Sequence, residues 1–240
     1  MRIPRIYAPA ATSPGQAVDL NPAAARHVVK VLRLAPGAPL ILFDGRGRAF
    51  SARLGSCKPA VARLDEALEL DTGPPLRIEL LQALSRSAKM DLVVQKAVEL
   101  GVESVVPVIT ERSVMRLDAA GAEKKRVHWE SVAISACEQC GRNRLPTVHA
   151  PVALDEALAA DDAALQLLLD PEADTSLPTA PPPTRIRLLI GAEGGLTEAE
   201  RAAALAQGFR PMRFGPRVLR TETAAVAALA VVQYQWGDLR

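Results

Sequence analysis

From residue 76 onward, short apolar segments alternate with longer helical ones, and this alternation constrains the fold more than any other feature of the chain. Four segments are short and nearly continuously apolar, as strands buried on both faces are: 76–84, 104–109, 165–169 and 186–190. Four others have helical spacing or are apolar almost all round: 88–100, 123–138, 197–207 and 223–236. This alternation predicts an α/β domain built around a mostly parallel sheet.

The part of the chain before this domain has a different texture, because short strand-like runs are separated by turns. The strand-like runs are residues 38–43, 49–54, 60–64 and 67–70. Asp44-Gly45-Arg46-Gly47, between the first two runs, is a hairpin signal. Residues 23–34 have helical spacing and stop at Ala-Pro-Gly. A small β-barrel with one helix fits these segments best.

The two parts meet at residues 71–75, where Gly-Pro-Pro can continue neither a helix nor a central strand. We therefore expect domains at 1–72 and 73–240. The whole chain has a net charge of +2, but residues 1–64 carry +8 and the remainder carries −6. A basic module joined to an acidic one favours a polyanionic partner such as nucleic acid. A solvated basic surface with no partner is the alternative.

Targeting signals are not apparent in the sequence. The first residues contain no continuous apolar run, and the longest apolar stretches are too short to cross a bilayer. The cysteines, Cys57, Cys137 and Cys140, are few and odd in number, as reduced thiols usually are. We expect a cytoplasmic protein with no membrane contact.

A glycine-rich turn, Gly191-Ala-Glu-Gly-Gly195, follows the expected strand 186–190 and precedes a helix with a capping box at Thr197 and Glu200. Glycines between a strand and a helix let a ligand approach the backbone and present free N–H groups to it. The spacing is neither a dinucleotide-binding fingerprint nor a P-loop. Ligand binding and a tight structural turn both remain open for this segment.

A second unusual segment, residues 214–223, leads into the last helix. Thr221 or Thr223 could cap that helix, and Glu222 would suit its positive end. Capping does not explain Arg217 and Arg220, because cations are disfavoured near a helix N-terminus. An anionic substrate accounts for these arginines better.

Cys137-x-x-Cys140 invites a zinc or redox interpretation, and neither is favoured. Zinc usually takes four ligands, and the chain offers only one further cysteine and three scattered histidines. Redox motifs of this spacing open a helix, whereas these cysteines close one. We expect small buried thiols and no metal site. Arg142 and Arg144, just beyond, are expected on an exposed turn that could bind phosphates.

Segments spread along almost the whole chain carry a resemblance to a known family. They are residues 1–7 (MRIPRIY), 27–33, 43–45, 89–91 (KMD), 95–101 (QKAVELG), 136–144, 189–195 and 215–223. Together, in this order, they resemble the RsmE family of 16S ribosomal RNA uridine-N3 methyltransferases, members of the knotted SPOUT superfamily. Ala192 departs from the proline common in that family, which should slightly alter the rigidity of the loop.

The resemblance implies a PUA-like β-barrel followed by an α/β domain whose chain end threads a loop to form a trefoil knot. It also implies a homodimer that holds S-adenosylmethionine in the knot. By matching segments, two residues form an apolar wall, two loops wrap the cofactor and two threonines close the pocket. These residues are Leu169, Ile190, Gly191, Glu193, Gly194, Gly195, Phe214, Gly215, Val218, Leu219, Thr221 and Thr223.

Methylation of uridine N3 requires alignment, loss of the N3 proton and a cation near the developing imide anion. We expect Arg220 to offset that charge, and Glu222 or Glu138 to position the base or accept the proton. The substrate would be 16S ribosomal RNA or the assembled small subunit. The residues expected to bind RNA are Arg2, Arg5, Arg26, Lys30, Arg33, Arg142 and Arg144.

Three other functions compete with this one. A binding protein without catalysis would explain the basic first part but not two glycine-bearing loops on one sheet. A nucleotide-dependent oxidoreductase would need the dinucleotide fingerprint that the turn lacks. A related methyltransferase that modifies a different RNA nucleotide is the main alternative.

Overall fold

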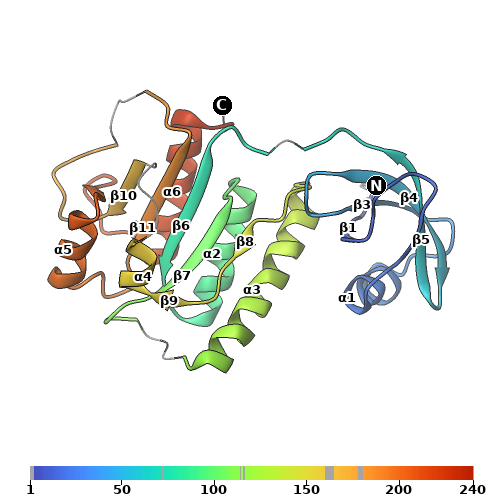
Figure 1. The fold of residues 1–240 in the computed structure, drawn as a ribbon, viewed down its shortest axis with the longest axis horizontal. Coiled ribbons are helices and arrows are strands. Elements are labelled where there is room, and N and C mark those ends of the chain that lie inside the picture. Colours follow the sequence, from blue (N-terminus) through green and yellow to red (C-terminus); the bar gives the residue numbers. More distant parts are fainter. Residues whose placement is uncertain are drawn as a thin grey trace. The chain divides into compact units, whose positions relative to one another are not determined.

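The computed structural model of the protein describes residues 3–71, 73–113, 115, 117–159, 165–177 and 181–239. The chain divides into two compact units (Figure 1). The N-terminal unit comprises Met1–Gly73 and Ile134–Leu145, and the C-terminal unit comprises Pro74–Ala133 and Pro146–Arg240. A segment from the middle of the chain thus joins the N-terminal unit. Arg2, one of the expected RNA contacts, lies outside the described residues.

The N-terminal unit is built on a five-stranded sheet of order β1-β3-β4-β5-β2. Its strands are β1 (Arg5–Tyr7), β2 (Ala17–Asp19), β3 (Pro39–Phe43), β4 (Ala49–Cys57) and β5 (Ala60–Ala67). β1 runs parallel to β3, and the other neighbours are antiparallel. Leu40, Leu42, Ala52 and Leu54 alternate with more exposed residues along β3 and β4 and lie in the core of this unit.

The predicted hairpin between β3 and β4 is confirmed. Buried Asp44 closes it, because its Oδ1 accepts hydrogen bonds from the backbone N–H groups of Arg46 (2.7 Å) and Arg48 (3.0 Å). The separate strand predicted over residues 67–70 is wrong, because the chain leaves the sheet after Ala67. β5 pairs with Phe50 at Ala67. β4 begins only one residue earlier, at Ala49, so it offers β5 almost no further partner.

The helix predicted over residues 23–34 is found in two parts. α1 (Pro22–Arg26) begins with Asn21, whose side chain accepts a hydrogen bond from Ala24 N at 2.9 Å. The chain then continues as a π-helical turn, η1 (His27–Val31). Arg33, with φ of 53°, lies just beyond this turn.

The C-terminal unit contains a parallel sheet of order β12-β10-β11-β6-β7-β8, with β9 also paired to β7. Its strands are β6 (Arg77–Ala83), β7 (Ser104–Ile109), β8 (Thr147–Val148), β9 (Val152–Ala153), β10 (Leu165–Leu169), β11 (Arg185–Ile190) and β12 (Arg210–Met212). The four strands predicted in this part are confirmed as β6, β7, β10 and β11. The sequence did not predict β8, β9 or β12, which are too short to show a period.

Helices cover the sheet of the C-terminal unit. They are α2 (Ser87–Glu99), α3 (Ala119–Cys140), α4 (Leu154–Leu158), α5 (Glu198–Ala206) and α6 (Thr221–Trp236). Leu81, Leu168 and Leu189 are neighbours by register and pack in one core with α4 and α5. α6 packs against α2, and its Gln233 Nε2 donates to Leu100 O at 2.8 Å. None of the helices in the described ranges is both long and apolar enough to span a bilayer.

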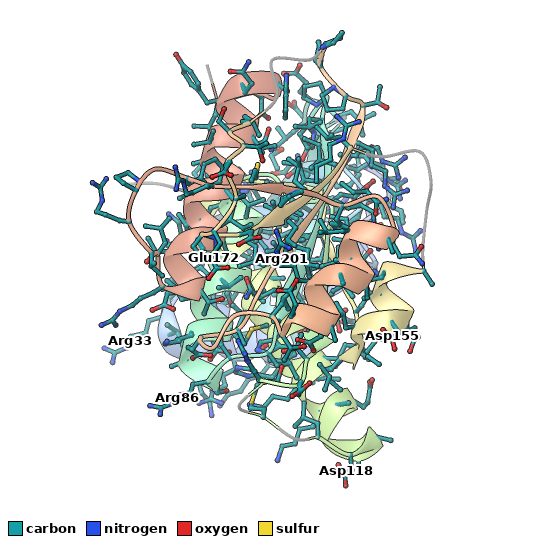
Figure 2. All side chains as sticks on the ribbon, turned by 90° about the vertical axis from the view of Figure 1, so that its left-hand side faces the viewer. Arg33, Arg86, Asp118, Asp155, Glu172 and Arg201 are labelled. Atoms are coloured by element: carbon teal, nitrogen blue, oxygen red, sulfur yellow. The ribbon has the colours of Figure 1, made fainter. Side chains whose placement is uncertain are left out.

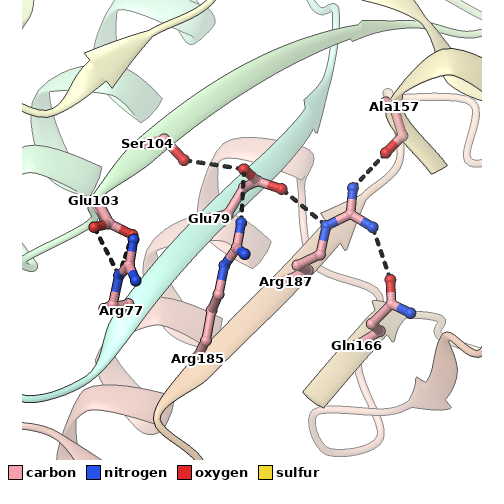
Figure 3. Close-up of polar contacts among 8 residues, drawn as sticks. All are labelled: Arg77, Glu79, Glu103, Ser104, Ala157, Gln166, Arg185 and Arg187. Atoms are coloured by element: carbon pink, nitrogen blue, oxygen red, sulfur yellow. Dashed lines mark hydrogen bonds and ion pairs between the residues drawn. The ribbon is translucent and has the colours of Figure 1, made fainter. Parts of the chain in front are cut away.

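A polar network occupies the amino-terminal half of this sheet (Figure 3). Arg187 on β11 is 1% exposed, and its Nε donates to Glu79 Oε1 on β6 at 2.8 Å. Its Nη1 donates to Gln166 Oε1 on β10 at 2.8 Å, and its Nη2 donates to Ala157 O. Ser104 Oγ also donates to Glu79, at 3.2 Å. The buried charge is therefore paired and hydrogen-bonded on several sides, as a buried guanidinium must be.

Candidate active site

A cavity of about 340 Å³ opens at the carboxyl ends of β10 and β11. Parallel α/β sheets commonly bind ligands at this edge, and the volume is in the range of small-molecule sites. Its walls come from six places: residues 168–172 at the end of β10, residues 190–196 at the end of β11, the start of α5, residues 213–214 and 217–219, Ala224 on α6, and Arg112. Both segments that the sequence analysis singled out therefore line one cavity.

The glycine turn after β11 is tight. Gly195 N donates to Ala192 O at 2.9 Å, and Gly195 has φ of 71°, which favours glycine. A Cβ on Gly191 would lie 3.2 Å from Gly195 Cα, so the turn has little room for a side chain there. Compact backbone of this kind lets a ligand approach the main chain closely.

Thr221 links the two segments. It is 5% exposed, its Oγ1 donates to Gly191 O at 2.6 Å, and the same oxygen accepts from Gln82 Nε2 at 2.9 Å. The alternative interpretation, in which Thr221 or Thr223 caps the last helix, does not hold. Arg220 is the N-cap, without a side-chain capping bond, and Thr221 begins the helix. The hydroxyl is used instead to join α6 to the carboxyl ends of β6 and β11.

Lys89, in the first turn of α2, lies between two acidic side chains. Its Nζ is 3.1 Å from Glu193 Oε1 in the glycine turn and 3.4 Å from Glu222 Oε2 in the first turn of α6. Burial raises the pKa of Glu193, but backbone N–H groups and the Lys89 ammonium outweigh burial and hold that pKa below its usual value. Three elements therefore meet at one ammonium beside the cavity.

The cavity wall carries charges of both signs. The basic residues are Arg112, Arg201, Arg213 and Arg217, and the acidic residues are Asp170, Glu172, Glu193 and Glu198. Figure 2 labels Glu172, after β10, and Arg201, on α5. Arg201 Nε donates to the buried Asp170 Oδ2 at 2.7 Å, which ties α5 to the end of β10. A ligand with positive and negative groups would suit such a wall.

Most of the expected cofactor residues line this cavity. Those that do are Leu169, Ile190, Gly191, Glu193, Gly194, Gly195, Phe214, Val218 and Leu219. Gly215, with φ of 66°, forms the turn between Phe214 and Arg217 without lining the cavity. Thr221 lies behind the glycine turn, and Thr223 is exposed on the first turn of α6.

The expected catalytic residues are found in both units. Arg220 and Glu222 lie at the start of α6 in the C-terminal unit. Glu138 belongs to the N-terminal unit, where its Oε1 accepts a hydrogen bond from Tyr7 N at 3.0 Å. Burial raises the pKa of Glu138, against the opposing effects of that N–H group and of His27. Glu138 thus holds β1 in place by accepting the hydrogen bond from the Tyr7 backbone.

The expected RNA contacts of the N-terminal unit differ in exposure. Arg26, Lys30 and Arg33 are exposed on or just after the α1–η1 helix. Arg5 is half-buried, donates to Asn143 Oδ1 and lies 5.6 Å from the Phe43 ring centroid. These contacts hold Arg5 within the unit.

The expectation of an exposed turn at Arg142 and Arg144 is wrong. Both side chains are partly buried, and Arg144 Nε donates to Asp71 O at 2.8 Å. Burial raises the pKa of Asp71, but backbone N–H groups, first that of Asn143, outweigh it and hold the pKa below its usual value. The segment beyond α3 is thus fastened to residue 71.

The cysteines are free thiols. Cys137 is buried near the end of α3, and burial raises its pKa to about 12, so it is a poor nucleophile. Across the ranges that the structure describes, no three histidine, cysteine or acidic side chains gather as a metal site would require.

Four residues in or beside the cavity were given no role from the sequence alone: Gln82, Lys89, Arg112 and Asp170. One signal was available for Lys89, because a cation in the first turn of a helix is disfavoured, just as at Arg220. Asp170 and Arg112 each follow an expected strand within a few residues, where parallel sheets place their binding groups. Gln82 lies within the mostly apolar strand β6, and only its burial in the structure marks it as a residue with a role.

A chain that contains both a basic unit built on strands and a parallel sheet with a cavity at its carboxyl edge is typical of α/β proteins that act on nucleic acid. Comparison with known proteins narrows this class. A family model described as RNA methyltransferase domain matches residues 72–233, and one described as RNA methyltransferase PUA domain matches residues 20–57.

Relatives match over essentially the whole chain. Ribosomal RNA small subunit methyltransferase E of Buchnera aphidicola is 32% identical over 99% of this chain and 98% of its own length. A putative methyltransferase from Legionella pneumophila, solved with bound SAM, is 41% identical with a TM-score of 0.94 and full coverage of both chains. The small subunit methyltransferase E of Neisseria gonorrhoeae, bound to S-adenosyl methionine, is 39% identical with a TM-score of 0.92, again with full coverage.

The chain therefore belongs to the RsmE family of RNA methyltransferases. The predicted fold class, a PUA-like N-terminal domain with a SPOUT-type α/β domain, is confirmed. The trefoil knot stays a prediction.

Proposed function

We propose that this protein transfers a methyl group from S-adenosylmethionine to N3 of one uridine in 16S ribosomal RNA of the small subunit. The observation that carries the proposal is the single cavity lined by the two loops, which the Thr221 hydroxyl joins. Similar chains from Legionella and Neisseria were solved with this cofactor, and the relatives are named as small-subunit enzymes.

The residues of the cavity fit this cofactor. Leu169, Ile190 and Leu219 offer apolar wall for an adenine ring, and the glycine turn brings the main chain close to a ligand. The charged wall suits a molecule that carries a carboxylate, an ammonium and a sulfonium. When bound, the cofactor supplies the methyl group on its sulfonium.

The residues at the start of α6 would act on the uridine. The Glu222 carboxylate would accept the N3 proton and leave a lone pair on N3 to receive the methyl group, whose bond to sulfur would break with the electron pair staying on the sulfur. Arg220 offsets the negative charge that develops on the imide during this step. Lys89 holds Glu222 beside the cavity through their 3.4 Å ion pair. We favour Glu222 over Glu138 as the proton acceptor, because the Glu138 carboxylate already binds the Tyr7 N–H.

The N-terminal unit would bind RNA through exposed cations. Arg26 and Lys30 lie on the α1–η1 segment and Arg33 follows shortly after it, a spacing that suits a phosphate backbone. Phosphate contacts release counterions, so affinity for RNA should fall steeply with salt. Arg5, Arg142 and Arg144 are held within their unit and would mainly shape this surface.

We also propose a cytoplasmic homodimer with a knotted C-terminal unit. α6 exposes apolar surface at Val231 (40%) and Tyr234 (66%), and Leu92 on the neighbouring α2 is 42% exposed. Apolar side chains on two adjacent helices favour a protein–protein interface. The dimer of two identical chains would bury this surface symmetrically.

The test is mass mapping of 16S ribosomal RNA from a strain that lacks this gene, before and after incubation with the purified protein and cofactor. We expect one new methyl group, on N3 of a single uridine, with naked RNA and assembled subunits compared in parallel. A methyl group on another nucleotide would support the alternative, a related methyltransferase with a different target. Absence of any methyl group on either substrate would contradict the proposal.

A further inference from the structure

The segment that follows β7, Thr110–Ser113, forms a compact turn against the glycine turn (residues 191–195). Thr110 N donates to Ser113 Oγ at 2.9 Å, and Ser113 N donates to Thr110 O at 3.0 Å. Glu111 N donates to Glu200 Oε1 at 2.7 Å. Glu200 is the capping-box residue of α5, and its other oxygen accepts from Thr197 N at 2.8 Å. The turn is therefore anchored to the helix that follows the glycine turn.

Arg112 reaches from this turn to the glycine turn itself. Its Nη1 donates to Gly194 O at 2.7 Å and to Leu196 O at 3.2 Å. Its side chain also lies close against Gly194, since a Cβ there would be 3.3 Å from Arg112 Cβ and Cδ. Arg112 lines the cavity, although it comes from a loop that is distant in sequence.

These two bonds set the orientation of two peptide groups. A peptide is planar, so fixing a carbonyl oxygen also fixes the following N–H. The N–H that follows the Gly194 carbonyl is that of Gly195, which donates to Ala192 O. The N–H that follows the Leu196 carbonyl is that of Thr197, which donates to Glu200. One guanidinium thus holds the second half of the glycine turn and its entry into α5.

We propose that Arg112 is a positioning residue for the cofactor, which holds the glycine turn in the shape that binds the nucleoside. The proposal rests on the proposed use of S-adenosylmethionine. Without Arg112 the turn would have to be ordered when the ligand binds, and that cost lowers affinity. Because Arg112 is itself exposed, its loss should leave the folded state nearly unchanged.

The experiment is calorimetric titration of the full-length protein with S-adenosylhomocysteine and with 5′-methylthioadenosine, which lacks the amino-acid part. For Arg112→Ala we expect both dissociation constants to rise by the same factor, about ten-fold, as charge-assisted hydrogen bonds and a preorganised loop are lost. Arg112→Lys keeps the charge but not the planar guanidinium, so it should fall in between, at about three-fold. Turnover at saturating cofactor should stay within about two-fold of the parent, because only ground-state binding is lost.

Arg126→Ala is the matched control. Arg126 is also bound by hydrogen bonds, to Glu123 and Glu130 on α3, but does not line the cavity. We expect it to bind both ligands as the parent does. Unchanged affinities in Arg112→Ala would overturn the inference, as would a loss confined to S-adenosylhomocysteine, which would make Arg112 a contact to the amino-acid part. If the parent protein bound neither ligand, the proposed function itself would fail.

Discussion

The two ends of β11 use polar residues in opposite ways. At the amino-terminal half, Arg187 is 1% exposed and bonds to Glu79, Gln166 and Ala157, so its charge is satisfied inside the protein (Figure 3). At the carboxyl end, the strand runs into a glycine turn beside an open cavity lined by charges of both signs. One strand can therefore tie neighbouring elements together at one end and present groups to a ligand at the other.

The largest effect should come from breaking the closed end. Arg187→Ala removes the buried guanidinium and leaves the partly buried Glu79 with only Ser104 and Arg185, so we expect the free energy of unfolding to fall by about 3–5 kcal/mol. Urea denaturation measures this loss. Arg77→Ala is the control, because the Arg77–Glu103 pair on the same sheet is 61% and 41% exposed and should contribute less than about 1 kcal/mol. Similar losses in the two variants would refute the distinction between buried and exposed pairs.

Breaking the open end should change chemistry instead of stability. For Arg220→Ala we expect turnover to fall about 100-fold or more, as removal of a charge-stabilising group does, with cofactor affinity within about three-fold of the parent. Single-turnover methylation and calorimetry measure the two quantities. Arg210→Ala, an exposed arginine on β12 that does not line the cavity, serves as control. Equal loss of turnover and affinity would rule out the proposed role of Arg220.

Thr221 joins elements of the core and also supports the cavity wall, so its loss should affect both stability and cofactor affinity. Thr221→Val leaves the Gly191 carbonyl and the Gln82 amide without their shared partner. We expect unfolding free energy to fall by about 2 kcal/mol and cofactor affinity to fall several-fold. Thr221→Ser keeps the hydroxyl and should restore most of both. A Thr221→Val variant that lost stability but kept cofactor affinity would show that these hydrogen bonds do not shape the cofactor site.

The smallest effect should come from Glu138, in the other unit. The pKa of the Glu138 carboxyl is raised in the folded protein, so the folded protein binds this proton more tightly than the unfolded chain does. The stability that this group contributes is complete at pH values below the ordinary carboxyl range and is lost as pH rises through the raised pKa. Glu138→Gln should remove this decline, measured as denaturation midpoints at about pH 4 and about pH 8, and should keep methylation activity. A collapse of turnover in Glu138→Gln would instead favour it as the proton acceptor.

The sequence predicted those features whose signals are local. The capping box at Thr197 and Glu200 is present, because the two residues that form it are three apart. The buried strands β6, β10 and β11 were predicted because leucine and isoleucine dominate them, although each also carries charged or amide side chains. β12 escaped prediction because it is three residues long and contains Pro211, which an edge strand tolerates.

Features that depend on strand register could not be predicted in the same way. The Thr221–Gly191–Gln82 link joins residues 30 and 139 positions apart, and it forms only because β6 and β11 are neighbours in the sheet. Lys89 meets two carboxylates for the same reason. The placement of residues 134–145 in the N-terminal unit follows from contacts with β1 and residue 71, which local patterns do not encode.

The most direct test of the account is a crystal structure of the protein grown with saturating S-adenosylhomocysteine. We expect the nucleoside to lie between residues 191–195 and 214–219, with its ring against Leu169 and Ile190. Ligand bound elsewhere, or an empty cavity in a protein that binds the compound in solution, would contradict the central claim.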